Sequence, residues 1–177
     1  NEWVSGYVGS VLAKYGDQNA RIVASDTLRR LLRSRFLLKG WGYNHKVPPD
    51  ADSTLWVCKL AQQLQAENHW RVRRAKSFLN KHVDGKGSVH TYYNSYAIRL
   101  FTKLHKTNVS FDGWCGAHTC VTAAFANINH ARTKDALDYL QQQQQTAGYW
   151  KAHWWTDNEY ATALAVEALH GRGTEND

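Results

Sequence analysis

The residues with the clearest chemical potential lie between Gly40 and Trp56, in the segment GWGYNHKVPPDADSTLW. An aromatic-glycine turn is followed by two prolines and then by Asp50 and Asp52, which open an apolar helical segment. Carboxylates at such a position cap a helix or occupy its first turn, where negative charge is favoured. They also lie at the mouth of any cavity that the helices enclose, so these two carboxyl groups are the first candidates for a functional site.

A second group of candidates lies in the segment DGWCGAHTC. Thiolate and imidazole groups at Cys-x-x-His-x-Cys spacing could hold a zinc ion. The ligands would be Cys115, His118, Cys120 and, as the fourth, Asp112 or another His. The alternative is that the cysteines are buried structural residues beside a helix start. His118 could instead lie near Asp52 and influence its protonation.

The elements that must position these residues are helices, because helical periodicity dominates the chain and almost nothing has the alternation of a strand. Three apolar stripes at helical spacing are Leu28, Leu31, Leu32 and Phe36, then Val72, Ala75, Phe78, Leu79 and His82, then Tyr93, Ala97, Leu100, Phe101 and Leu104. Further helices are expected at about 1–15, 53–66, 118–129, 131–145 and 157–170. Before the last of these, Thr156 and Glu159 have the spacing of a capping box.

Short glycine-rich turns recur between the helices. Gly40 and Trp41 follow one helical stripe, and Gly148 and Trp150 follow another. Recurring turns of this kind indicate stacked helix pairs, in which neighbouring pairs complete a common core. We therefore expect an all-α fold of antiparallel helix pairs, with residues 1–177 forming one domain.

Composition narrows the function classes. The chain has 43% hydrophobic residues, eight Trp and nine Tyr, which suits a real core and an aromatic-lined pocket for a hydrophobic ligand. Lys and Arg outnumber Asp and Glu by 22 to 15. The basic residues are spread along helices, where they form either solvated outer faces or a surface for an anionic partner. No nucleic-acid motif, phosphate loop, G-x-S-x-G elbow or H-E-x-x-H helix is present, so we expect no nucleic-acid partner and no nucleotide or serine-hydrolase chemistry.

The cysteines and apolar runs bear on the compartment. Three cysteines without framework spacing favour a reducing compartment. Neither a membrane-spanning run nor a signal peptide is evident, so we expect a cytoplasmic protein, with peripheral membrane contact left open. The chain begins at Asn1 and contains no Met, as expected of a processed chain or of a piece of a longer one.

These residues resemble the squalene-hopene cyclase-like, or terpene cyclase/prenyltransferase, α/α-toroid family. The family repeat ends an outer helix with an aromatic-aliphatic pair and a Gln, followed by Gly-x-Trp, which is matched by Ala136, Tyr139, Leu140, Gln144, Gly148 and Trp150. The D-x-D-D-T motif of the cyclases follows a Gly-Trp turn and is matched by Gly40, Trp41, Pro49, Asp50, Asp52 and Thr54, with Ser53 in place of the last Asp. The resemblance implies an α/α toroid, or part of one, that acts on an isoprenoid without a cofactor. Because this chain is short for such an enzyme, a homo-oligomer or a partner domain is expected to complete the cavity.

The resemblance also implies roles for individual residues. Asp52 matches the general acid that protonates an alkene or epoxide, with Asp50 as its partner. The acid must be protonated near neutral pH, which desolvation and the charge of Asp50 favour and the helix N-terminus opposes. Aromatic faces would stabilise the resulting carbocation. The candidates for this substrate-binding wall are Trp3, Tyr7, Trp41, Trp56, Tyr96, Trp114, His118, Trp154 and Trp155.

Two other functions compete with a protonating cyclase. The first is a non-catalytic module of the same fold that binds an isoprenoid, lipid or peptide. The second is zinc-dependent prenyl transfer, although the zinc ligands of protein prenyltransferases have a different spacing from those at Asp112 and Cys115.

Overall fold

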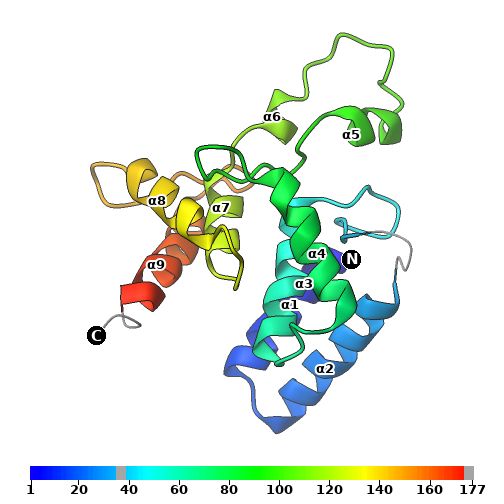
Figure 1. Cartoon of the computed structure of the whole chain (residues 1–177), viewed down its shortest axis with the longest axis vertical. Helices are drawn as coiled ribbons and strands as arrows, with labels where there is room; N and C mark the ends of the chain where they lie inside the picture. The colour runs from blue at the N-terminus through cyan, green and yellow to red at the C-terminus, as the bar shows by residue number, and fades with distance from the viewer. Residues whose placement is uncertain (35–38, 174–177) are drawn as a thin grey trace.

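The computed structural model describes residues 1–34 and 39–173, and its regular elements there are helices (Figure 1). The elements are α1 (Glu2–Tyr15), α2 (Gln18–Arg33), α3 (Ala51–Gln63), α4 (Trp70–Leu79), the 3-10 helix η1 (Asn80–His82), α5 (Tyr96–Phe101), α6 (Asp112–Cys115), α7 (Thr119–Ala126), α8 (Thr133–Gln143) and α9 (Glu159–Gly173). The described β-structure is limited to two isolated bridges, Val83 with Val89 and His90 with Ala117. The prediction of an all-α fold is confirmed.

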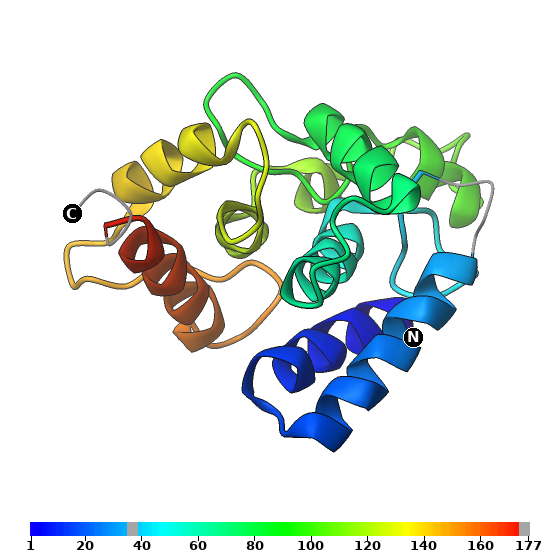
Figure 2. The same cartoon turned by 60° about the horizontal axis from the view of Figure 1, so that its bottom comes forward.

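The helices are arranged as an inner arc with a second layer outside it. Figure 2 shows α1, α3, α7 and α9 following one another along the arc, with α2, α4 and α8 on the outer side. Each outer helix packs on an inner neighbour: α2 on α1, α4 on α3 and α8 on α7. The inner helix α3 is buried almost all round, with ten of its thirteen residues buried. This pairing explains the amphipathic outer stripes, since an outer helix has only one face to bury.

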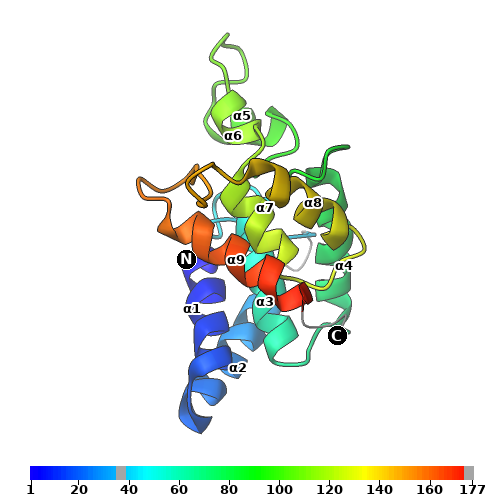
Figure 3. The same cartoon turned by 90° about the vertical axis from the view of Figure 1, so that its left-hand side faces the viewer.

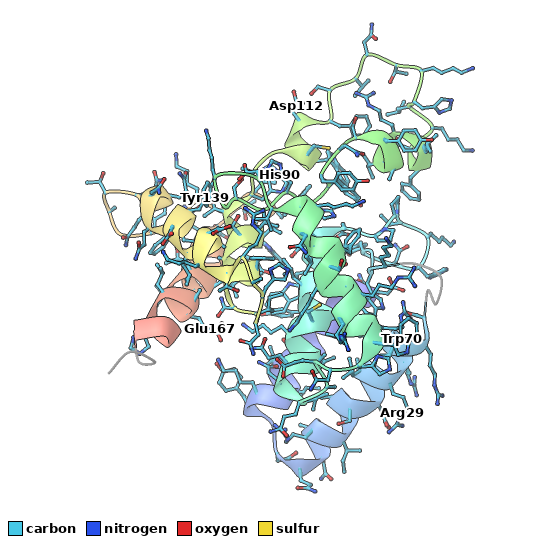
Figure 4. The ribbon with its side chains drawn as sticks, viewed as in Figure 1. Arg29, Trp70, His90, Asp112, Tyr139 and Glu167 are labelled. Atoms are coloured by element: carbon cyan, nitrogen blue, oxygen red, sulfur yellow. The ribbon has the colours of Figure 1, made fainter. Side chains whose placement is uncertain are left out.

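An ion-pair cluster links α9 to α1 and α3. Glu167 on α9 accepts hydrogen bonds from Lys14 on α1 at 2.6 Å and from Lys59 on α3 at 2.9 Å. Lys59 is buried, and both amines favour the ionised carboxyl, so the pKa of Glu167 is lowered despite its burial. Figure 4 labels Glu167 on its helix, on the side that faces α1 and α3.

The turn that leads into α3 is fixed by Trp41. Its side chain is fully buried, and its indole N–H donates to the carbonyl of Leu31 at 2.9 Å. Its backbone N–H donates to the hydroxyl of Thr54 at 3.0 Å, and that hydroxyl donates back to the Trp41 carbonyl at 3.1 Å. The turn is therefore tied both to the outer helix α2 and to the inner helix α3.

The turn that leads into α9 repeats this pattern. The Trp150 indole donates to the carbonyl of Leu140 at 2.7 Å, and the Trp150 backbone N–H donates to the Thr162 hydroxyl at 3.1 Å. Trp150 is also buried. The shared hydrogen bonds account for the similar sequences of the two turns, because each joins an outer helix to the next inner one.

Two local predictions are wrong. The stripe from Tyr93 to Leu104 is not one buried helix face: α5 is six residues long, Tyr93, Leu100 and Phe101 are exposed, and Ile98 is buried instead. The stripe from Val72 to His82 is confirmed as a buried face, with Phe78 partly buried. Phe36, the last residue of the first predicted stripe, lies outside the described residues.

The capping box at Thr156 is also absent. Helix α9 starts at Glu159, and the first helical bond runs from the Thr162 N–H to the Asn158 carbonyl. The Thr156 hydroxyl donates to Asp157 instead. The turn before α9 contains a hydrogen bond from the Ala152 N–H to the side chain of Asn158, the residue that directly precedes the helix.

Among the predicted solvated basic residues, Arg71 is buried instead of exposed. Its guanidinium lies 5.0 Å from the centre of the Trp41 ring and donates to the carbonyls of Leu32, at 2.6 Å, and Ser34. Arg71 therefore anchors the end of α2 to α4. Figure 4 shows Arg29 and Trp70 on the outer helices α2 and α4, away from the interior of the arc.

The segment from Tyr93 to Phe111 extends beyond one end of the helix layers, carrying α5 and leading into α6 (Figure 3). Ile98 and Phe111 of this segment form a small core together with Tyr92, the residue directly before it. None of the described helices combines the length and the apolar character that crossing a bilayer requires.

Candidate functional site

The N-terminus of α3 holds the two candidate carboxyl groups. Asp50 is the N-cap: one carboxyl oxygen accepts from the Ser53 N–H at 2.7 Å and the other from the Ser53 hydroxyl at 3.0 Å. The Asp50 N–H donates to the Trp41 carbonyl, so the buried tryptophan turn places the cap. Capping, one of the two interpretations of Asp50, is therefore present in the structure.

Asp52, in the first turn of α3, makes a different set of contacts. Its Oδ2 accepts from the indole N–H of Trp3 on α1 at 2.8 Å. The Trp56 indole N–H is directed to the same carboxyl from one turn farther along α3, without reaching hydrogen-bond geometry. Asp52 is partly buried, and none of the described ion pairs joins it to a basic residue.

Burial decides the protonation of this pair. It raises the pKa of Asp50 to about 8, with the charge of Asp52 as the second cause, against the hydrogen bonds from Ser53. It raises the pKa of Asp52 to about 6, against the hydrogen bond from Trp3. Desolvation thus outweighs the preference of a helix N-terminus for the anion, and the pair retains a proton near neutral pH.

Both carboxyl groups line a cavity of about 480 Å³. The remaining lining residues are mostly aromatic or aliphatic: Trp3, Val4, Tyr43, Val47, Ser53, Thr91, Tyr92, Ile98, Phe101, Thr102, Trp114, Trp154 and Trp155. None of them is Lys, Arg or His, so the described wall offers no cation to neutralise a bound anion. A protonated carboxyl group on an apolar, aromatic wall is the arrangement that a proton donor for a hydrocarbon requires.

The structure brings together four of the nine predicted wall residues on the cavity: Trp3, Trp114, Trp154 and Trp155. Tyr7 and Trp56 lie behind this wall, where the Tyr7 ring stacks on Trp3 with 5.3 Å between centroids and Trp56 meets Trp3 edge-on. They support the wall without lining it.

The other three predicted wall residues lie elsewhere. Trp41 is fully buried in the core and bonded to Leu31, which corrects its assignment to the substrate wall. Tyr96 is 71% exposed on α5 and does not line the cavity. His118 is buried next to the wall instead of on it, and its Nδ1 lies 2.8 Å from the hydroxyl of the lining residue Thr91.

The segment before α9 completes the wall. The Trp154 indole donates to the Thr91 hydroxyl at 3.1 Å, and the His153 ring stacks on His118 with 3.7 Å between centroids. Burial, followed by the proximity of His153, lowers the pKa of His118 to about 3, so this imidazole is neutral. His118 therefore positions the Thr91 and Trp154 wall and does not face Asp52 as a charged partner.

Several lining residues were missed by the sequence analysis. Tyr43 lies in the same turn as Trp41, and its closeness in sequence to Asp50 and Asp52 could have identified it as a lining residue. Tyr92, Ile98, Phe101 and Thr102 reach the cavity through the long excursion between η1 and α6. Nothing in their local pattern indicates which of them faces Asp52.

The zinc hypothesis does not fit the described side chains. Among residues 1–34 and 39–173, no group of three or more His, Cys, Asp or Glu is placed to hold a metal ion. Both ring nitrogens of His118 are engaged, by Thr91 and by the Gly113 carbonyl at 3.1 Å. Burial raises the pKa of the Cys120 and Cys115 thiols, which disfavours the thiolates that zinc binds.

A second hollow of about 550 Å³ lies on the outer side, between α2 and the segment that joins α3 to α4. Its lining includes Arg29, Arg33 and Trp70 and none of the predicted site residues. The cavity beside Asp52 is therefore the candidate site.

Solved structures with a similar fold include those of a terpene cyclase. The type II terpene cyclase MstE from Scytonema matches with a TM-score of 0.86 and 37% identity, over 97% of this chain and 50% of that one. A variant of MstE in complex with geranylgeranyl dihydroxybenzoate as substrate matches with a TM-score of 0.85 and 38% identity, over 97% of this chain and 49% of that one. A protein from Actinoplanes matches at 0.89 and 36%, over 99% and 53%.

The chain has a terpene cyclase fold. It spans about half the length of the solved structures that it matches. Another MstE structure, of a variant with an aspartate replaced by alanine, contains merosterolic acid A as product. No protein-family model matches the chain, and a search of curated proteins finds no match either.

The raised pKa of Asp50 in this terpene cyclase fold predicts a pH-dependent stability. A carboxyl group whose folded-state pKa is raised contributes stability at low pH that is lost as pH rises through the folded value. The free energy of unfolding is therefore expected to fall as the pH is raised from about 7.5 to 8.5. Below that range the histidines of the unfolded chain, with a pKa near 6.5, still bind protons that the buried His82, His118 and His130 do not, so their contribution rises with pH and opposes that of Asp50.

Urea unfolding of the wild type and of Asp50→Asn across this range measures the effect. Asparagine remains a good N-cap, so Asp50→Asn is expected to flatten the profile while retaining the helix start. Parallel profiles for the two proteins would show that the Asp50 carboxyl is not protonated in the folded state.

Proposed function

We propose that this chain forms the acid-bearing part of a class II terpene cyclase, in which Asp52 protonates an isoprenoid and starts its cyclisation. The observation that carries the proposal is the position of Asp52: its pKa is raised by burial, it has no basic partner in the described ion pairs, and it lines an aromatic cavity. The matched MstE structures, two of them with geranylgeranyl dihydroxybenzoate as substrate, support the same class of reaction.

Asp52 and the substrate account for every bond that breaks or forms in the proposed step. The O–H bond of Asp52 breaks, and its proton adds to a terminal alkene carbon, whose π electrons form the new C–H bond. The carboxylate of Asp52 and a tertiary carbocation result. Internal alkenes then attack the cation in turn, and the faces of Trp3, Trp114, Trp154 and Trp155 stabilise the positive charge as it moves. Loss of a proton or capture by a nucleophile ends the sequence.

The wall also bears on the substrate class. Its described residues provide aromatic faces and hydroxyl groups, the latter from Ser53, Thr91, Thr102 and two Tyr residues, but no cation. We infer that the part of the ligand next to Asp52 is an uncharged hydrocarbon end. The first probe is therefore geranylgeranyl dihydroxybenzoate, incubated with the protein and analysed for cyclised product by mass spectrometry.

A binding module of the same fold is the alternative, and the half-length of the chain relative to its structural neighbours favours it. In that case the protein would retain the isoprenoid on gel filtration without turnover. Cyclised product formed by the wild type would exclude this alternative.

The finer architecture, a toroid, is part of the proposal. Val4, Val8 and Val11 form a stripe on α1, spaced to share one helix face, and each is 40–44% exposed. We propose that further helix pairs cover this stripe and complete the ring, supplied by a second copy of the chain or by a partner domain. Continuity supports this, because Val4 belongs both to the stripe and to the cavity wall.

Light scattering distinguishes the two sources. A solution mass of twice the chain's 20.2 kDa that returns to the single value in Val8→Glu would identify a second copy. A single mass for the wild type would exclude a second copy as the source of the further helix pairs. If Val8→Glu instead leaves a doubled mass unchanged, the α1 stripe is not the contact.

A further inference from the structure

Trp3 lines the cavity and also contacts the candidate acid, Asp52. It lies at the start of α1, and its indole N–H donates to Oδ2 of Asp52 across 49 residues of sequence. The bond is 2.8 Å long and partly buried. Because a carboxylate carries charge, the bond is charge-assisted whenever Asp52 is ionised. Among the described residues, Trp3 is the side chain that hydrogen-bonds the Asp52 carboxyl group directly.

The Trp3 ring is held in place from three sides. Tyr7 stacks on it with 5.3 Å between centroids and an interplanar angle of 14°. Trp56 meets it edge-on at 6.2 Å, and Trp155 packs against it at 6.2 Å. The backbone beneath it is fixed as well, because the Trp3 N–H approaches the Tyr43 carbonyl at 3.4 Å. The direction of the indole N–H is therefore set by packing before any substrate binds.

The position of the donor decides which carboxyl oxygen carries the proton. An oxygen that accepts an N–H bond offers its lone pair to that donor, whereas the proton of a neutral carboxyl group lies on the other oxygen. With Oδ2 committed to Trp3, the proton of Asp52 lies on Oδ1. After proton transfer, the same N–H stabilises the carboxylate that remains, which makes Asp52 a stronger acid than burial alone would allow.

We propose that Trp3 is a positioning residue for the general acid, which directs the Asp52 proton to Oδ1 and stabilises the conjugate base through its indole N–H. The catalytic consequence of this inference rests on the proposed function. The hydrogen bond and its effect on the pKa of Asp52 do not.

Other titratable groups face Asp52 from the surrounding helices and must be distinguished from this effect. Asp50 lies at the start of α3, Cys120 on α7 and Tyr160 on α9, and each interacts electrostatically with Asp52. Asp50 retains its proton while Asp52 titrates, because its pKa is the higher of the two, and the neutral thiol and phenol of the other two add no charge near neutral pH. The Trp3 N–H thus opposes the effect of burial.

The test compares Trp3→Phe with the wild type and with Trp70→Phe. Phenylalanine keeps a ring at position 3 and removes the N–H, and Trp70 is a half-exposed residue on α4 outside the cavity. The Asp52 carboxyl carbon is titrated by NMR in each protein. Its midpoint is expected to rise by about one pH unit in Trp3→Phe and to stay unchanged in Trp70→Phe. An unchanged midpoint in folded Trp3→Phe overturns the proposal.

A second measurement needs no variant at position 3. In wild-type protein with ¹⁵N-labelled tryptophan, the Trp3 indole resonance is expected to titrate with the midpoint of Asp52 and to lose this titration in Asp52→Asn. A Trp3 resonance that is insensitive to pH in the wild type contradicts the proposal even if Trp3→Phe fails to fold.

Turnover tests the catalytic consequence separately. In Trp3→Phe, kcat is expected to fall about tenfold and the alkaline limb of the pH profile to move upward, because a weaker acid retains its proton to higher pH but transfers it more slowly. Loss confined to KM would mean that Trp3 only contacts substrate. Absence of turnover in the wild type would count against the proposed function, while the NMR titrations would still decide the role of Trp3.

Discussion

Asp52→Asn is expected to reduce the formation of cyclised isoprenoid by about 10³-fold or more, the scale on which a positioned general acid contributes. Asparagine has nearly the same shape and can still accept the Trp3 N–H through its amide oxygen, but it has no acidic proton to transfer. The wild-type rate is expected to fall as the pH is raised through about 6, because the donor must carry its proton. Product formation followed by mass spectrometry over a pH series measures both effects.

Asp135→Asn is the matched control for this loss. Asp135 also lies in the first turn of a helix, α8, but its carboxylate pairs with Arg132 at 2.8 Å and does not line the cavity. Its replacement is expected to leave cyclisation within about twofold of the wild type. Substantial turnover in folded Asp52→Asn would exclude Asp52 as the acid, and cyclisation would then need another proton donor, of which buried Asp50 is the nearest candidate.

The helix pairs could be predicted because their signals are local. An outer helix such as α4 buries one stripe, so Val72, Ala75 and Leu79 recur at helical spacing and are buried as expected. The tryptophan turns are equally local, since their partners lie ten residues earlier and about a dozen later. In α5 the same periodicity failed, because its neighbours come from the excursion itself and bury Ile98 instead of the predicted stripe.

The site was predictable only in part, for a physical reason. The aspartates were identified from a helix start, which is a local feature, but their pKa values depend on burial by distant segments. Trp3 is 49 residues from Asp52 in sequence, and Trp154 is 63 residues from Thr91. Whether a tryptophan after a glycine faces the core, as Trp41 does, or the cavity, as Trp114 does, depends on packing that neither composition nor spacing contains.

Trp41→Ala is expected to lower the free energy of unfolding by about 3–5 kcal/mol, the usual cost of truncating a large buried aromatic side chain. The ring is fully buried, its N–H satisfies the last turn of α2 at Leu31, and the buried guanidinium of Arg71 lies over its face. Truncation removes all three contacts and leaves Arg71 in a cavity. Because domains are commonly stable by 5–15 kcal/mol, the loss is a large share of the total, and urea unfolding measures it.

Two further variants show whether the repeated turn is the cause. Trp150→Ala removes the equivalent bonds before α9, so a loss of similar size is expected there. Trp70→Ala, on the outer surface, is expected to cost less than about 1 kcal/mol. If Trp41→Ala were as mild as Trp70→Ala, the tryptophan turn would not be what holds α2 against α3. The position of the Asp50 cap, which bonds to the Trp41 carbonyl, would then need another explanation.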